Sequence, residues 1–158
     1  MQNNGTGIFG GCGNSSIVNN SICLNDESGI VLSSSLDNLI ADNLVQGNKE
    51  SGIMLILASA NVIQGNNASY NAHSGISLLF SWQNIIMENR MANSLDGLYL
   101  GNSSDGNVIS YNAIAFNRLG VNIASSSTNV IHHNRFEAND YDSYDDGENQ
   151  WDDGIEGN

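Results

Sequence analysis

The sequence predicts an all-β protein, a right-handed single-stranded parallel β-helix with about 22–23 residues and three short strands in each coil. Three observations predict this fold. A glycine that precedes an apolar residue recurs every 22 or 23 residues, three apolar positions recur in phase with it, and asparagines lie between them. An internal repeat of this length indicates a solenoid, and parallel crossover connections are right-handed as a rule.

Each repeat begins at the glycine, which we interpret as a bend residue that must lack a β-carbon. Short segments with period-two alternation follow it, too short for helices, and Asn, Ser and Gly separate them as turn formers. No LxxLxLxxN frame of a leucine-rich repeat is present. Residues at the same place in successive coils form a column. The glycine column is Gly7, Gly29, Gly52, Gly75, Gly97 and Gly120; the apolar columns are Ile30, Ile53, Ile76, Leu98 and Val121, then Ile17, Ile40, Ile63, Ile86, Ile109 and Ile131, then Ile22, Val45, Ala68, Met91, Ile114 and Phe136.

The asparagine columns predict ladders of stacked side-chain amides, in which each amide donates to the carboxamide oxygen of the next coil. We expect structural asparagines rather than sugar ligands, placed at bends because asparagine tolerates left-handed backbone angles. The column that holds in all six repeats is the best candidate for an inward ladder: Asn20, Asn43, Asn66, Asn89, Asn112 and Asn134. The other two columns are Asn38, Asn61, Asn84, Asn107 and Asn129, and Asn25, Asn48, Asn71, Asn93, Asn117 and Asn139.

Charge and composition exclude several partner classes. The chain has 17 acidic and 4 basic residues and a net charge of -13, so no cationic patch exists to bind nucleic acid or anionic membranes. No apolar run approaches the roughly 20 residues of a membrane span. Cys12 and Cys23 form no CxxC or zinc motif, and we expect two buried thiols, with a disulfide between them left open.

The repeat unit Gly-Ile-x-Leu…Ser-x-x-Asn-x-Ile-x-x-Asn and the tail resemble NosD-like proteins, also described as carbohydrate-binding and sugar-hydrolysis domains. The tail motif runs through Asp146-Gly147-Glu148-Asn149-Gln150-Trp151-Asp152 to Gly157-Asn158. We divide the chain into about six β-helix coils over 1–139 and an acidic C-terminal capping segment over 140–158. The resemblance implies a secreted, periplasmic or cell-surface location. Because the chain opens within a repeat and family tails continue further, we expect a longer parent chain with further coils or domains.

Catalysis is not expected from these coils, and no catalytic residue is assigned. Glycoside hydrolysis needs two carboxylates within about 10 Å of each other. Asp42 and Glu88 share a column but lie two coils apart, and we place Asp96 and Asp105 on other faces with no base among clustered acids. The function predicted is therefore a non-catalytic module that binds carbohydrate or builds a surface structure. The alternative is a fragment of a polysaccharide lyase, epimerase or hydrolase whose catalytic coils lie outside this chain.

Aromatic residues give the one hint of a ligand. Phe80, Trp82 and Tyr99 come from adjacent coils, and we expect their rings to form a platform that stacks on sugar faces of a polysaccharide or glycan. The alternative is that these rings pack over the edge of the core.

No cofactor is expected, with calcium left open. Asp140, Asp142, Asp145 and Asp146 supply the hard oxygen ligands that calcium prefers, although no EF-hand spacing is present. We favour a cap in which Trp151 packs near Phe136 over the last apolar layer.

Copper is implied by the resemblance, since NosD serves the maturation of a copper enzyme. Neighbours on an extended segment point to opposite faces, so His132 and His133 are predicted to diverge and copper binding is disfavoured. The remaining candidate ligands form no motif for soft ligands: His73, Met54, Met87, Met91, Cys12 and Cys23.

Overall fold

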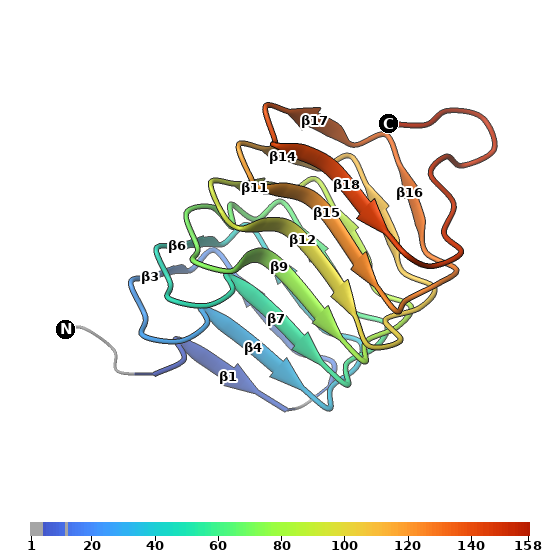
Figure 1. The fold of residues 1–158 in the computed structure, drawn as a ribbon. Coiled ribbons are helices and arrows are strands. Elements are labelled where there is room, and N and C mark those ends of the chain that lie inside the picture. The colour runs from blue at the N-terminus through green and yellow to red at the C-terminus, as the bar shows by residue number, and fades with distance from the viewer. Residues whose placement is uncertain (1–4, 12) are drawn as a thin grey trace.

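A computed structural model describes residues 5–11 and 13–158, which wind as a parallel β-solenoid of about six turns, without a helix in this part of the chain (Figure 1). The fold prediction is confirmed. The longest strands form a seven-stranded parallel sheet, here called the long sheet, whose strands follow each other up the rod. Its strands are β1 (Ile8–Gly10), β4 (Ile30–Ser33), β7 (Ile53–Ile56), β9 (Ser74–Leu79), β12 (Asp96–Gly101), β15 (Leu119–Ala124) and β18 (Tyr141–Asp145).

Two further faces complete each coil. The six-stranded sheet contains β2 (Ser16–Val18), β5 (Leu39–Ala41), β8 (Val62–Gln64), β10 (Ile85–Met87), β13 (Val108–Ser110) and β16 (Val130–His132). The third face is divided into two parts, which isolated bridges from Asn67 to Leu44 and to Arg90 connect. One part contains β3 (Ser21–Cys23) and β6 (Leu44–Gln46), and the other contains β11 (Arg90–Ala92), β14 (Ala113–Ala115) and β17 (Arg135–Glu137).

The apolar columns stack inside the coils as predicted. Ile53 pairs in register with Ile76, and Ile76 pairs with Leu98. All three are fully buried, as are most members of the other two columns. Each coil therefore buries its apolar face only against its neighbours, which is the physical basis of solenoid stability.

The predicted asparagine ladder exists, and Asn89 shows its bonding. The Asn89 Nδ2 donates to Asn112 Oδ1 (3.1 Å) and to the Ile63 (2.8 Å) and Met87 (2.9 Å) carbonyl oxygens. Its Oδ1 accepts hydrogen bonds from the backbone N and the Nδ2 of Asn66, both 2.9 Å long. Each amide thus satisfies donors and acceptors that would otherwise be buried without partners.

The other two columns also form ladders, which the sequence did not rank as inward. One prediction was wrong: Ser94 rather than Asn93 occupies the fourth place, since Asn71 N donates to Ser94 Oγ and Ser94 N donates to Asn117 Oδ1. The reason given for asparagine also changes. The left-handed residue is the one before each amide, as at Glu88 (φ 58°) and Tyr111 (φ 56°). The amides are there for hydrogen bonding, and the preceding residue makes the bend.

The glycine column must lack β-carbons, as predicted, and the structure shows the reason. Its members do not have positive φ; among the described glycines, only Gly47, Gly65, Gly106 and Gly154 do. A β-carbon at Gly97 would instead lie 2.6 Å from the Gly120 carbonyl oxygen and 2.7 Å from Ile114 Cγ2. Glycine is required because successive coils approach closely at this corner, not because the backbone is left-handed.

The acidic tail continues the winding. Strand β18 pairs with β15, and Gln150 forms a bridge with Val130. The ladders also continue, because Asn129 donates to Asn149 Oδ1 and Asn134 donates to Asn158 Oδ1. Residues 140–158 thus lie on the end of the rod, and the half-buried Trp151 packs against the core together with Phe136.

We predict that deleting residues 140–158 makes the rod self-associate. The deletion would uncover Phe136 and the edges of β15 and β16, and unpaired edges promote association. Size-exclusion chromatography with light scattering would measure this. A monomeric, equally stable truncated protein would show that the tail does not protect the end.

Two smaller observations complete the fold. The Cys23 thiol is exposed, so the prediction of a buried thiol was wrong there, because the side chain points outward from the edge of β3. Cys12 lies outside the described residues, and so does any disulfide to it. No helix in the described ranges is long and apolar enough to cross a membrane.

Candidate functional site

The outer face of the long sheet carries a hollow of about 300 Å³, here called the Asp96 hollow. A volume of this size is at the lower end for small-molecule sites. The hollow spans β7, β9 and β12 together with the bends that lead into them. Its lining mixes hydroxyl, imidazole, carboxyl, phenol and apolar groups: Ser51, Met54, His73, Ser74, Ser77, Leu79, Leu95, Asp96 and Tyr99.

Asp96 is the unusual residue of this hollow because its carboxyl group is buried, with 7% of the residue exposed. Its Oδ2 accepts a hydrogen bond from Asn122 Nδ2 (3.1 Å). Its Oδ1 has no hydrogen-bond partner among the described residues. Burial raises the pKa of Asp96 above its ordinary 3.8, against the opposing effects of the Asn122 hydrogen bond and the charges of Arg118 and His73.

The repeat period brings these groups together. Asp96 pairs with Ser74 on one side and Leu119 on the other, so the preceding residues His73 and Arg118 come from the coils below and above. The sequence analysis expects no base among the acids, whereas the register of the long sheet places Arg118 and His73 in the coils next to Asp96. Strands β9, β12 and β15 begin before the glycine column and are six residues long. The signal in the sequence is a single acid in the column before the repeat glycines, whose other members are uncharged: Thr6, Ser28, Ser51, Ser74 and Leu119.

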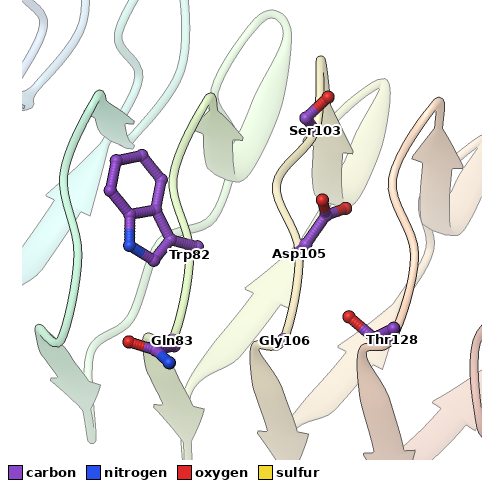
Figure 2. A pocket seen from close by; sticks show the side chains of 6 residues that line it. All are labelled: Trp82, Gln83, Ser103, Asp105, Gly106 and Thr128. Carbon is purple, nitrogen blue, oxygen red and sulfur yellow. The ribbon is translucent and has the colours of Figure 1, made fainter.

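The three predicted aromatic residues do not line one site. Tyr99 lines the Asp96 hollow, and its ring lies over Gly101, where a β-carbon would be 2.5 Å from the phenol oxygen. Phe80 lies on the bend after β9, has a positive φ and is 47% exposed. Trp82 lines a second, open hollow with Gln83, Ser103, Asp105, Gly106 and Thr128, and Figure 2 shows its indole pointing away from Asp105 and Thr128.

The four acids proposed for calcium serve mainly as hydrogen-bond acceptors in the tail. Asp145 accepts from Asn149 Nδ2 (2.7 Å) and Trp151 Nε1 (2.9 Å). Asp146 accepts from Ser125 N, Asp142 accepts from Asn139 Nδ2, and Asp140 is exposed. Calcium binding there stays a prediction.

A second cluster lies at the C-terminal end, where the Nδ1 atoms of His132 and His133 are 2.7 Å apart. Asp153 Oδ2 lies 3.7 Å from His132 Nδ1 and 3.9 Å from His133 Nδ1. The prediction that the two histidines diverge was wrong. His133 has φ 54°, and the alternation of side chains holds only along extended backbone, so the bend after β16 turns both rings to one side.

The potential ligand atoms of His132, His133 and Asp153 all lie within 4.8 Å of one another, close enough to share one metal ion. Backbone hydrogen bonds from Glu156 and Ile155 hold the pKa of Asp153 below its ordinary value, which keeps the carboxylate ionised. Imidazole nitrogens suit copper, zinc and nickel. Among the predicted sulfur ligands, Met87 lies two coils away in the same column, and Met91 is buried in the core. The donor set therefore fits copper(II) better than copper(I).

Comparisons with solved structures show the same fold. The periplasmic alginate epimerase AlgG aligns with a TM-score of 0.70 and 20% identity over 92% of this chain and 43% of that chain. The Azotobacter vinelandii mannuronan C-5 epimerase AlgE6 A-module aligns with a TM-score of 0.71 and 14% identity, over 94% of this chain and 54% of that chain. The enzymatically active domain of bacteriophage CBA120 tailspike protein 2 aligns with a TM-score of 0.73 and 14% identity, over 84% of this chain and 22% of that chain.

This chain thus spans about half, or less, of the length of each of these structures. No curated protein sequence matches it significantly. A family model described as periplasmic copper-binding protein (NosD) matches residues 1–158. With its whole length covered by that family model and its coils wound as a parallel β-solenoid, this chain belongs to the NosD family.

Proposed function

We propose that this chain is a non-catalytic, extracytoplasmic NosD-like module that binds neutral carbohydrate at the Asp96 hollow. One observation carries the proposal: a buried carboxyl group with one unpartnered oxygen lines a hollow that also offers hydroxyls, a tyrosine ring and apolar side chains. Sugars present hydroxyl donors and apolar ring faces, and this lining matches both. An extracytoplasmic location is supported by the family description and by the periplasmic epimerase of the same fold.

The charge of the chain decides which carbohydrate is favoured. The solved structures of the same fold include an alginate epimerase and a mannuronan epimerase, which supports a polysaccharide ligand. This chain, however, carries a net charge of -13 and an acid at the hollow. A carboxylate accepts hydrogen bonds from sugar hydroxyls but repels uronate carboxylates. Neutral glycans are therefore the expected ligands. Phe80 and Trp82, which follow β9, would then contact a longer chain beyond the hollow.

Binding can be tested by titration calorimetry with neutral gluco- and manno-oligosaccharides, and with alginate oligosaccharides as the anionic probe. We expect binding of a neutral glycan that Asp96→Asn or Tyr99→Ala weakens at least about tenfold, the effect of losing an interaction worth about 1.4 kcal/mol. Tyr70→Ala, a change at an exposed tyrosine outside the hollow, is the control. Equal affinity in all variants would contradict the site, and tighter alginate binding would contradict the charge argument.

The absence of catalysis is tested separately. Incubation with pectate, alginate or polygalacturonate should release neither unsaturated uronates nor reducing ends. Turnover abolished by Asp96→Asn, or by Asp42→Ala or Glu88→Ala, would instead favour the alternative of a lyase, epimerase or hydrolase fragment.

We predict that Asp96→Asn stabilises the fold while weakening ligand binding. Since the folded-state pKa of Asp96 lies above 3.8, its contribution to stability is present below pH 3.8 and is lost as pH rises through the raised pKa. At neutral pH the buried carboxylate therefore lowers the free energy of unfolding. Asparagine keeps an oxygen for Asn122 and carries no charge, so we expect a higher urea midpoint for Asp96→Asn at neutral pH.

Urea denaturation at neutral pH and below pH 3.8 measures this effect, with the exposed Asp37→Asn as control. The gain should vanish at the lower pH. A loss of stability at neutral pH would mean that the Asp96 charge supports the fold, which would remove the reason to assign that charge to a ligand.

A further inference from the structure

We propose that His132, His133 and Asp153 bind one divalent transition-metal ion, preferentially copper(II), and that this ion fastens the last turn of the rod to β16. The proposal goes beyond glycan binding and involves different residues at the C-terminal end. It names both a site and a structural role for the ion.

The distances between the ligand atoms support a shared ion. Two nitrogens bound at about 2.0–2.1 Å from one ion, at a right angle, lie about 2.9 Å apart. The two Nδ1 atoms are 2.7 Å apart, and Asp153 Oδ2 is within 3.9 Å of both. Ligand atoms on nearly opposite sides of one ion lie about 4 Å apart, so the carboxylate oxygen fits a position across the ion from the two nitrogens. Nitrogen and oxygen donors in such planar arrangements are typical of copper(II).

The surroundings orient the ligands. Glu156 Oε2 lies 3.0 Å from His133 Nε2. The carboxylate can only accept a hydrogen bond there, so the Nε2–H tautomer is favoured and the Nδ1 lone pair faces His132 and Asp153. A carboxylate partner of this kind fixes the ring and its tautomer in metal sites. Tyr111 stacks on the His133 ring, with centroids 4.9 Å apart. Asp153 is held in turn by its Oδ1, which accepts from Ile155 N and Glu156 N.

The position of the ligands gives the ion its structural role. His132 and His133 belong to β16 and its bend, whereas Asp153 comes from the tail about one turn later. Backbone hydrogen bonds already connect these parts at two places, where Ile131 N donates to Gln150 O and His133 N donates to Gly157 O. The Asn158 side chain adds to them, because its Oδ1 accepts from Asn134 and its Nδ2 donates to the Ile131 carbonyl oxygen. Most of residues 152–158 are exposed. An ion shared by both segments would therefore hold the exposed residues 152–158 against β16.

The first experiment is titration calorimetry and electron paramagnetic resonance of the full chain with copper(II) alone. We expect one ion per chain, with nitrogen hyperfine coupling in the spectrum, and weaker binding of zinc(II), following the usual order of affinities. His132→Ala and His133→Ala should abolish this binding, whereas His73→Ala, at the third histidine, should leave it unchanged. Asp153→Asn keeps the side-chain oxygen that accepts hydrogen bonds from Ile155 N and Glu156 N, but it removes the charge of the ligand. This change should weaken copper(II) binding at least about tenfold, as should Glu156→Gln.

The second experiment measures hydrogen exchange with and without copper(II). Exchange of the His133, Ile131 and Asn134 amides should slow on binding, and the melting temperature should rise by about 5 °C at a hundredfold excess over Kd. Both effects should disappear in Asp153→Asn, a variant that circular dichroism can verify as folded. Binding that survives in the His132→Ala, His133→Ala double variant would overturn the site. Binding without slower exchange would overturn the fastening role.

Discussion

Replacing Asn89 with leucine is expected to lower the free energy of unfolding by about 3 kcal/mol, because a buried polar group left without its partner costs about 1–3 kcal/mol. Asn89 is 1% exposed and lies in the middle of its ladder. Leucine would leave the Asn66 backbone N–H without its acceptor and the Ile63 carbonyl without its side-chain donor. It would also remove the donor to Asn112, so two interfaces between coils weaken at once.

Chemical denaturation monitored by circular dichroism measures this loss. The matched control is Asn20→Leu, the same change at the exposed first member of the same ladder, where we expect less than about 1 kcal/mol. Equal effects at both positions would mean that burial of the amide does not determine its contribution. An unchanged midpoint for Asn89→Leu would contradict the ladder as a source of stability.

Replacing Gly97 with alanine is expected to cost about 3 kcal/mol, the upper range for overpacking a core. The new β-carbon would lie 2.6 Å from the Gly120 carbonyl oxygen, 2.7 Å from Ile114 Cγ2 and 2.9 Å from Asn117 Nδ2. The carbonyl oxygen belongs to backbone of the next coil, which cannot move without breaking the pairing of β12 with β15. The Asp96 hollow would be disturbed as well, since Asp96 directly precedes this glycine.

Gly5→Ala is the control, because a β-carbon there would meet only Glu27 Oε2 at 4.0 Å. Its stability should be unchanged or slightly raised, as alanine restricts the unfolded chain. If Gly97→Ala were equally harmless, the glycine column would need another explanation than the close approach of coils.

The two sites differ in how far the sequence could predict them. Tyr99 was identified from the alternation around Leu98 and Leu100, which holds because β12 is extended. Asp96 was missed because its strand starts before the repeat glycine. The histidine cluster does not follow from the sequence, because the rule of opposite faces fails at the left-handed bend that His133 makes.

The interior of this protein is predictable from its repeat. The 22–23-residue period, the buried apolar columns and the inward amides follow from it, because each buried position must match its equivalent in the next coil. The outward residues obey no such requirement. Contacts between coils determine where each strand begins and how a bend of positive φ rotates the next side chain. Contacts between coils therefore bring His73, Asp96 and Arg118 together and turn His132 and His133 toward Asp153. They also give Trp82 and Tyr99 different hollows to line, and the repeat predicts none of these arrangements.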